Sequence, residues 1–280
     1  MMKIGVLGAG TMGNGIAQVM ASAGHEVTLC DIDNETLRTA ASTIDANLWR
    51  LYKKENKEFS EIGQVLGRIT FTADKTKLVG LDIVIEAILE NSEIKKRMFA
   101  ELDVICDSKT ILASNTSGLS ITEIGAATER PDRVIGMHFF NPVPVMKLVE
   151  IIKGSDTSDV TYEIVKGLVQ HIGKESITIQ DAPLFVVNRI LVPMINEAIF
   201  VLGEGIATAE DIDKGMMLGT NQPIGPLALA DLIGLDTLLS VAETLFEETG
   251  DSKYRVPPLL RKNVRAGKLG RKTGKGFYTY

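Results

Sequence analysis

Residues 8–13 of the chain read GAGTMG and fit the pattern G-x-G-x-x-G. An apolar run over residues 3–7 precedes them and a helical pattern follows, so the glycines fall where a strand would turn into a helix. In that setting Gly8 permits a tight turn, Gly10 lets the backbone approach a pyrophosphate, and Gly13 allows close packing of helix on strand. The amino end of the helix adds unpaired N–H groups and the positive end of its dipole. These residues predict a site for the diphosphate of a dinucleotide.

A second apolar run, over residues 26–30, ends at Asp31, 23 residues beyond Gly8. A carboxylate in that place accepts hydrogen bonds from the adenosine ribose hydroxyls and repels a 2′-phosphate. Asp33 is a competitor for this role, but it lies two residues further from the strand end. The pattern therefore predicts that Asp31 binds the ribose and favours NAD over NADP.

The chain has three histidines, and histidine is the side chain whose ordinary pKa best suits proton transfer near neutral pH. His25 lies in a Gly-His-Glu turn and His171 at a polar helix end, so both are interpreted as structural. A pairing of Ser117 with His138 would suit a hydrolase. The chain lacks G-x-S-x-G, however, and hydrolysis would leave the dinucleotide motif without a purpose, so we reject that alternative.

Short β-branched runs alternate with helical patterns through the first two-thirds of the chain, which is typical of strand–helix–strand units around a parallel sheet. After Pro183 the pattern becomes almost entirely helical. We therefore predict an α/β domain over residues 1–183, with a Rossmann-type, doubly wound and largely parallel sheet, followed by an all-α domain over residues 184–280. The expected strands are 3–7, 26–30, 82–87, 110–113, 134–138, 148–152 and 176–180, and the expected early helices are 12–23, 35–54 and 93–105.

Composition excludes several classes of protein. Apolar residues make up 45% of the 280 and charged residues 24%, which is ordinary for a globular chain and rules out disorder. The net charge of −6 argues against nucleic-acid binding and against a general affinity for acidic membranes. The two cysteines, Cys30 and Cys106, stand far apart with no metal-binding spacing, and no apolar stretch is long enough to cross a bilayer. We expect a cytoplasmic protein without a metal site.

Three further segments complete a known pattern: residues 114–117 (SNTS), 136–142 (GMHFFNP) and 185–189 (FVVNR). With the glycine motif, residues 147–150 (KLVE) and the terminal 274–278 (GKGFY), the chain resembles the 3-hydroxyacyl-CoA dehydrogenase family over essentially its whole length. Within that family it is most similar to the short bacterial 3-hydroxybutyryl-CoA dehydrogenases. The resemblance implies NAD-dependent oxidation of (S)-3-hydroxyacyl-CoA, and the reverse reduction of acetoacetyl-CoA.

The resemblance also implies roles for individual residues. His138 becomes the catalytic base, Glu150 its partner, and Ser117 and Asn188 the polar groups at the substrate oxygen. His138 and Glu150 lie on successive predicted strands, which would bring them together if those strands are neighbours. The predicted cofactor-binding set is Gly8, Gly10, Thr11, Met12, Gly13, Asp31, Glu90, Lys95, Asn115, Asn141 and Lys272.

The predicted helix 35–54 is a candidate surface for the anionic CoA. Its apolar stripe is read as Leu37, Ala41, Ile44, Leu48 and Leu51. Beside that stripe Asn47, Arg50 and Lys54 follow the spacing i, i+3, i+7 and share a face. The resemblance places CoA contacts at Asn47 and Lys54, while the spacing equally fits an ordinary solvated basic face.

Two other functions stay open. A dehydrogenase of a free β-hydroxy acid would commonly use a lysine on the helix that here begins with Asn188 and Arg189, and neither residue is a lysine. A crystallin-like protein could have kept the fold and lost turnover. The apolar content after residue 184, together with the resemblance, predicts a homodimer built through the C-terminal domain.

Overall fold

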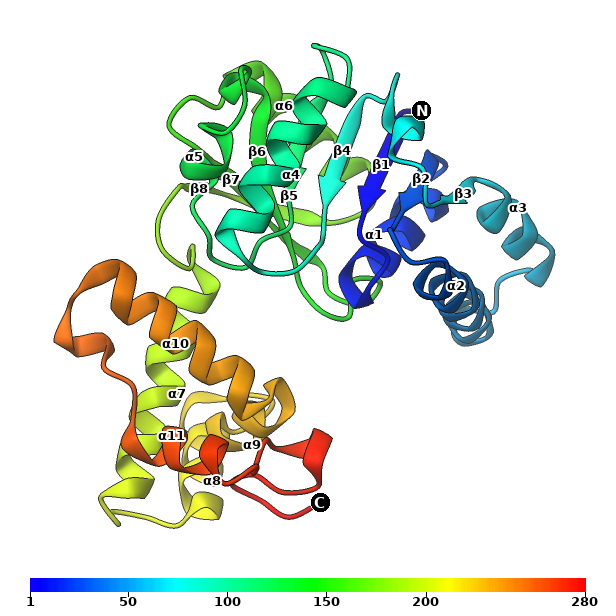
Figure 1. Cartoon of the computed structure of the whole chain (residues 1–280). Coiled ribbons are helices and arrows are strands. Elements are labelled where there is room, and N and C mark those ends of the chain that lie inside the picture. Colours follow the sequence, from blue (N-terminus) through cyan, green and yellow to red (C-terminus); the bar gives the residue numbers. More distant parts are fainter. The chain divides into compact units, whose positions relative to one another are not determined.

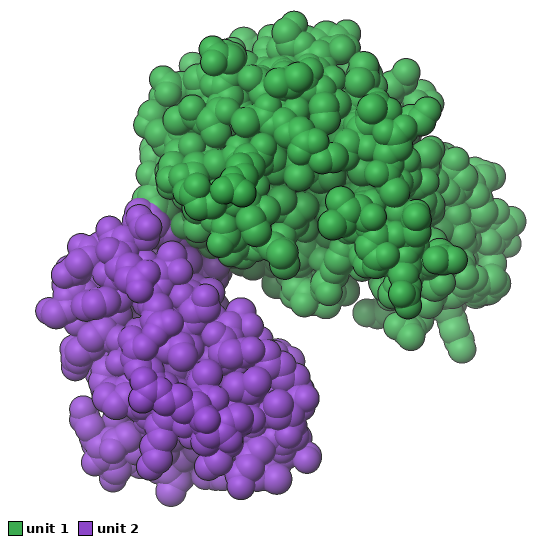
Figure 2. Space-filling model, in the orientation of Figure 1, with its two compact units in different colours: residues 1–182 green, residues 183–280 purple.

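The computed structural model describes residues 1–280, and the chain divides into two compact units (Figure 2). Unit 1 covers Met1–Ala182 and unit 2 covers Pro183–Tyr280. The division falls one residue before the boundary expected from the change in sequence pattern.

Unit 1 is built on an eight-stranded sheet of order β3-β2-β1-β4-β5-β6-β7-β8 (Figure 1). Every neighbouring pair is parallel except β6 and β7, which run antiparallel. The order reverses between β1 and β4, and open α/β sheets bind ligands at such a point, beyond the carboxyl ends of the strands. The predicted Rossmann-type sheet is confirmed. Its strands are β1 (Lys3–Leu7), β2 (Glu26–Cys30), β3 (Ile69–Thr72), β4 (Ile83–Glu86), β5 (Ile111–Ser114), β6 (Val134–Phe139), β7 (Leu148–Lys153) and β8 (Glu175–Gln180).

Helices cover both faces of this sheet. Alternate strand residues such as Ile4, Ile135 and Ile151 share one core with four of the helices: α1 (Thr11–Ser22), α2 (Asn34–Glu55), α3 (Ile62–Gly67) and α6 (Asp159–His171). Helices α4 (Ser92–Ile105) and α5 (Ile121–Gly125) lie on the opposite face (Figure 1), where Ile121 packs over Gly136 of β6. The 3₁₀ helices of the unit are η1 (Phe59–Glu61), η2 (Lys75–Leu78) and η3 (Pro131–Arg133).

Unit 2 is helical and has a core of its own. Residues 208–211 (TAED) place a hydroxyl three residues before an acid, which is typical of a helix start. In the structure Thr208 caps α8 (Ala209–Thr220), and its Oγ1 accepts a hydrogen bond from the Asp211 N–H at 3.2 Å. Two isolated β-bridges join residues of the C-terminal tail. The elements are α7 (Val187–Gly203), α8 (Ala209–Thr220), α9 (Pro226–Ile233), α10 (Leu235–Thr249), η4 (Ser252–Tyr254), α11 (Pro258–Arg265) and η5 (Arg271–Thr273). None of the helices in the chain is both long enough and apolar enough to span a membrane.

One buried carboxylate attaches the C-terminal tail to the rest of unit 2. Asp231 is 1% exposed and accepts hydrogen bonds from the backbone N–H groups of Phe277 and Tyr278, both at 2.9 Å. The Tyr280 hydroxyl donates a third bond at 3.2 Å.

Replacing Asp231 by Ala should therefore lower the free energy of unfolding by about 2–5 kcal/mol, because two backbone donors lose their acceptor. Chemical denaturation monitored by circular dichroism measures the loss. Tyr280→Phe removes only the single hydroxyl bond of a half-exposed residue and should cost under about 1 kcal/mol. Equal losses in the two variants would contradict this account of the tail.

Candidate active site

The turn after β1 requires glycine at two of its positions. Gly8 has φ +100°, and a Cβ there would lie 2.6 Å from the Ala87 carbonyl oxygen on the loop after β4. A Cβ at Gly13 would lie 1.7 Å from the Gly8 carbonyl oxygen. A Cβ at Gly10 would meet no protein atom within 4 Å. The turn is therefore closely packed within the protein and open at Gly10, where a diphosphate is predicted to approach.

The amino end of α1 has no side chain capping it and no acidic residue in its first turn. Four other α-helices of unit 1 do have a capping side chain: Asp33 caps α2, Asn91 caps α4, Ser120 caps α5 and Ser158 caps α6. The short helix α3 has none. An uncapped helix start offers its first N–H groups and its dipole to an anion. The start of α1 thus fits the diphosphate of NAD.

Two cavities border this turn. The first has a volume of about 490 Å³ and mostly apolar walls that include Ile32, Leu89 and Met98. The second, of about 560 Å³, shares Gly10, Thr11 and Thr36 with the first. From the predicted cofactor set, the first is lined by Gly8, Gly10, Thr11, Met12 and Asp31, and the second by Gly10, Thr11 and Asn141. An apolar pocket with a carboxylate at its edge has the chemistry that an adenosine requires.

Asp31 also holds the glycine turn in place. Its Oδ2 accepts a hydrogen bond from the Ala9 N–H at 2.7 Å, and its Oδ1 accepts one from the Asp33 N–H at 3.0 Å. Asp33, the competitor for the ribose, caps α2 instead. Hydrogen bonds from the Thr36 side chain and from the Glu35 and Thr36 backbone hold the pKa of Asp33 below its ordinary value. Of the two acids, Asp31 is the one that lines the apolar cavity.

His138 and Glu150 form a buried pair on neighbouring strands. The antiparallel register of β6 and β7 sets the two residues directly opposite each other. His138 Nδ1 lies 2.6 Å from Glu150 Oε2, and the residues are 4% and 0% exposed. Because strand residues alternate between faces, both point away from the face that carries Met137 and Val149. The carboxylate thus fixes which imidazole nitrogen faces it.

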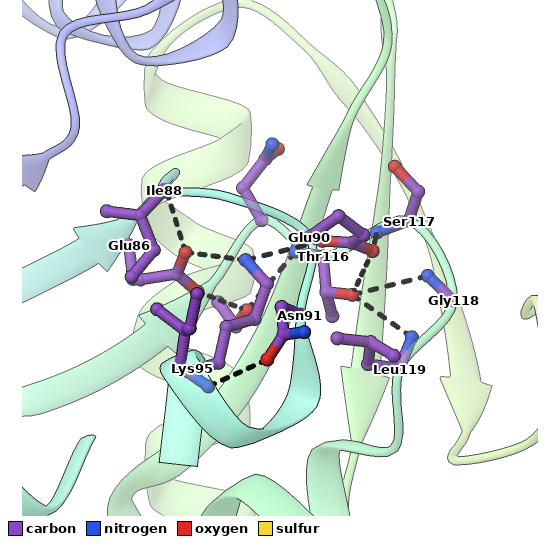
Figure 3. A network of polar contacts seen from close by, with 12 residues as sticks. Glu86, Ile88, Glu90, Asn91, Lys95, Thr116, Ser117, Gly118 and Leu119 are labelled. Carbon is purple, nitrogen blue, oxygen red and sulfur yellow. Dashed lines mark hydrogen bonds and ion pairs between the residues drawn. The ribbon is translucent and has the colours of Figure 1, made fainter. Parts of the chain in front are cut away.

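A polar network joins the loops after β4 and β5 (Figure 3). Lys95 of α4 is 1% exposed, and its Nζ lies 2.6 Å from Glu86 Oε1 and 3.3 Å from Glu90 Oε2. Glu90 Oε1 in turn accepts hydrogen bonds from the Thr116 hydroxyl at 2.5 Å and the Ser117 N–H at 2.8 Å. The structure therefore brings together Glu90, Lys95 and Ser117, which the sequence placed in separate segments.

Of the remaining predicted residues, Asn115 lies in unit 1, and Asn188 and Lys272 lie in unit 2. Asn115 is 8% exposed and its Oδ1 accepts a hydrogen bond from the Phe139 N–H at 3.0 Å, next to His138. Asn188 lies in the first turn of α7, and Lys272 lies 2.6 Å from the Asp236 carboxylate, so both belong to unit 2.

The three predicted CoA residues lie along α2. Asn47 lines the 560 Å³ cavity and, with Arg50 and Arg38, a further one of about 520 Å³ along the helix. Lys54 is exposed near the helix end and lines neither of these cavities.

Two buried charged residues beside this site, Glu86 and Lys174, were not predicted. Glu86 is fully buried at the end of β4, and its one signal was a charge that closes an otherwise apolar strand. Lys174 is 8% exposed and donates hydrogen bonds to the carbonyls of Val143 and Met146, at 2.6 and 2.5 Å. Burial lowers the pKa of Lys174. It fixes the loop between β6 and β7, and nothing in the local sequence distinguishes it from a surface lysine.

Known proteins are similar to this chain over nearly its whole length. The family profile described as "3-hydroxyacyl-CoA dehydrogenase, NAD binding domain" matches residues 3–182, and that described as "3-hydroxyacyl-CoA dehydrogenase, C-terminal domain" matches residues 185–280. The 3-hydroxybutyryl-CoA dehydrogenase of Clostridioides difficile is 50% identical over 279 residues, covering 100% of this chain and 99% of its own. The human mitochondrial hydroxyacyl-coenzyme A dehydrogenase is 43% identical over 282 residues, covering 98% of this chain and 90% of its own.

Among solved structures, that of (S)-3-hydroxybutyryl-CoA dehydrogenase from Ralstonia eutropha superposes with a TM-score of 0.97 at 52% identity, covering 100% of this chain and 99% of that one. Both profiles match in order and together they span nearly all of the sequence. The chain therefore belongs to the 3-hydroxyacyl-CoA dehydrogenase family, and it is an NAD-dependent oxidoreductase of the class that acts on a CH–OH group.

Proposed function

We propose that this chain oxidises (S)-3-hydroxyacyl-CoA thioesters, above all 3-hydroxybutyryl-CoA, and reduces acetoacetyl-CoA in the reverse direction. The observation that carries the proposal is the buried His138–Glu150 pair, with 2.6 Å between Nδ1 and Oε2. A histidine oriented by a carboxylate can move a proton between the substrate hydroxyl and itself. The names of the similar proteins from Clostridioides difficile and Ralstonia eutropha support the choice of substrate.

The protein's part in the reaction is proton transfer and positioning. Bound NAD supplies the nicotinamide that accepts or returns a hydride at the carbon bearing the oxygen. In the oxidation His138 removes the hydroxyl proton, and in the reduction it gives the proton back. Because Nδ1 faces Glu150, Nε2 is the nitrogen that exchanges this proton. Glu150 holds that tautomer and stabilises the imidazolium when it forms.

Two polar residues complete the proposed catalytic set. Ser117 and Asn188 donate hydrogen bonds to the substrate oxygen as it alternates between hydroxyl and carbonyl. The Glu90 carboxylate, which accepts the Ser117 N–H at 2.8 Å, supports this role because it restrains the serine's backbone. Asn188 enters the proposal through its place in the FVVNR segment alone.

The cofactor and CoA contacts are proposed from the placement of their residues. NAD is held by the glycine turn and Asp31, with further contacts from Glu90, Lys95, Asn115, Asn141 and Lys272. The CoA moiety lies along α2 against Asn47, Arg50 and Lys54. The cavities that Asn47 and Arg50 line along this helix support that path, since a long anionic ligand needs an extended polar groove.

The decisive assay is NADH oxidation with acetoacetyl-CoA beside free acetoacetate. Turnover of the thioester alone, or at far higher kcat/KM, is the expected result. Comparable turnover of the free acid would favour the free β-hydroxy acid dehydrogenase, although the start of α7 has no lysine to serve as its base. Binding of NADH without turnover of either compound would favour a crystallin-like protein.

Asp31 should set the choice of cofactor. Asp31→Ser combined with Ile32→Arg should raise the NADPH/NADH ratio of kcat/KM, because repulsion of the 2′-phosphate is replaced by attraction. Ile32 is 85% exposed and lines the same cavity, so an arginine there has room. Ile32→Arg alone is the control and should change the ratio less. A wild type that already prefers NADPH would refute the role of Asp31.

We also propose that the chain forms a homodimer through unit 2. Exposed apolar side chains of this unit include Ile190, Ile206, Leu218 and Leu232, each more than half exposed. Apolar surface of this kind is commonly buried between identical subunits. Sedimentation at micromolar concentration should give twice the chain mass of 30.4 kDa. A monomer, or a dimer that survives charged substitutions at these four positions, would contradict the proposal.

A further inference from the structure

We infer that Glu86, which lies outside the proposed catalytic set, is a positioning residue for the loop that carries Ser117. The inference rests on the proposed function for the role of Ser117 in turnover. Glu86 lies at the carboxyl end of β4, beside the point where the strand order reverses. It acts through Lys95 and Glu90, and the contacts run without a gap from Glu86 to the Ser117 backbone (Figure 3).

The polar groups that contact the Glu86 side chain are all hydrogen-bond donors, which suit a carboxylate. The residue is 0% exposed, and three donors converge on it: the Ile88 N–H at 2.7 Å, Lys95 Nζ at 2.6 Å and the Ser114 hydroxyl at 2.7 Å. Because all three are donors, both carboxylate oxygens act only as acceptors. The Ser114 hydroxyl also accepts the Thr116 N–H at 3.2 Å, which gives Glu86 a second connection to the same loop.

Lys95 carries the effect from Glu86 to Glu90. Its ammonium group lies between the two carboxylates, 2.6 Å from Glu86 Oε1 and 3.3 Å from Glu90 Oε2, and its side chain is 1% exposed. Glu90 by contrast has a side chain that is 45% exposed. An exposed carboxylate on a loop holds one rotamer only when something fixes it. Here a buried cation, itself fixed by Glu86, does so.

Glu90 then fixes the serine loop. Its Oε1 accepts hydrogen bonds from the Thr116 hydroxyl and from the Ser117 N–H. Thr116 Oγ1 accepts the Leu119 N–H at 3.0 Å in the same loop. The loop's conformation between β5 and α5 thus depends on the exposed Glu90, and Glu90 depends on the buried pair.

The charges of Glu86, Lys95 and Glu90 suggest a reason for this arrangement other than stability. Glu86 and Glu90 share one buried ammonium group, and burying the charges of Glu86 and Lys95 seldom adds stability compared with an apolar core. Such groups can instead specify one conformation among several. A fixed loop conformation is what a hydrogen-bond donor to the substrate oxygen requires, because small misplacements in an active site are costly in rate.

The test is a double-mutant cycle with Glu86→Gln and Ser117→Ala, measured as kcat for acetoacetyl-CoA reduction. In the wild-type background E86Q should lower kcat by about 10–100-fold. In the S117A background it should lower kcat by less than about threefold, because its effect passes through Ser117. Equal losses in both backgrounds would overturn the inference, and so would a wild-type kcat in E86Q.

A matched control lies on the same helix. Asp103 of α4 pairs with Arg130, and their side chains are 12% and 11% exposed. Their other hydrogen-bond partners are the backbone groups of Cys106, Asp107 and Glu129, none of which belongs to the serine loop. Asp103→Asn should therefore leave kcat unchanged and show no coupling to S117A. If D103N and E86Q lower kcat alike, the effect of E86Q is a general loss of stability and the inference fails.

Hydrogen exchange gives a readout that does not depend on turnover. The Ser117 amide should exchange faster in E86Q and at the wild-type rate in D103N, because only the first variant releases the Glu90 acceptor. Unchanged exchange in E86Q would overturn the inference even if turnover fell. If E86Q does not fold, kcat and the exchange of the Ser117 amide are measured in Glu86→Asp instead, because aspartate keeps the charge on a shorter side chain. A wild type without activity on acetoacetyl-CoA would refute the proposed function, while the exchange experiment would still decide the role of Glu86.

Discussion

His138→Gln should lower kcat for acetoacetyl-CoA reduction by about 10²–10⁴, the contribution typical of a positioned general acid–base group. Glutamine keeps much of the volume and a hydrogen-bonding end, but it cannot take up or release a proton. Binding of NADH, measured by fluorescence titration, should stay within a few-fold of wild type. The residues proposed for the diphosphate and ribose lie at the turn after β1 and at the end of β2, and His138 is not among them.

The matched control is His171→Gln. His171 is exposed at the end of α6 and contacts the Ala23 carbonyl at 3.2 Å, so its loss should leave kcat near wild type. A folded H138Q protein with wild-type kcat would remove His138 from the mechanism. A loss of NADH binding as large as the loss of kcat would instead assign His138 to the cofactor site.

Glu150→Gln should lower kcat by a similar factor, on the order of 10²–10⁴, with little change in NADH affinity. In the proposed mechanism the carboxylate, 2.6 Å from His138 Nδ1, accepts the hydrogen on that nitrogen and so leaves Nε2 able to take the substrate proton. An amide can turn its NH₂ group towards Nδ1, which forces the hydrogen onto Nε2 and gives the wrong tautomer for oxidation. The amide also cannot stabilise the imidazolium by charge.

Glu175→Gln, at the exposed start of β8 beside β7, is the control for a change of charge in this part of the sheet. It should leave kcat unchanged. Thermal unfolding of E150Q must be measured beside the kinetics, because Glu150 is fully buried. If E150Q is as stable as wild type and equally active, the histidine needs no carboxylate and the proposed division of labour is wrong.

Much of the first part of the site could be predicted because its signals are local. The strand, glycine turn and helix of residues 3–22 are specified by neighbours in the sequence: an apolar run, glycines at fixed offsets and a helical period. The same holds for the Thr208 cap and for the change to a helical pattern after Pro183. The resemblance supplied the proposed catalytic set, whose residues by themselves were open to several roles.

Elements with mixed signals were not predicted. Strand β3 has four residues at the edge of the sheet, and helix α6 is rich in β-branched residues that also suit strands.

Helix α2 was placed correctly, but its predicted buried stripe was partly wrong. The structure buries Ala40 and Tyr52 and leaves Ala41 and Leu51 only half-buried. A period of 3.6 residues leaves adjacent positions nearly equivalent, and packing against the sheet and α3 decides between them.

The sequence by itself determined the local units of this protein: where strands and helices begin, where the backbone must be glycine, and where a capping side chain stands. Only the tertiary structure decided which distant polar groups meet. His138 and Glu150 are 12 residues apart and come together through the register of two antiparallel strands. Ser114 and Glu86 are 28 residues apart and meet because β4 and β5 are parallel neighbours with their carboxyl ends at one edge. Strand order and register depend on packing over the whole sheet, so no short window of sequence contains them.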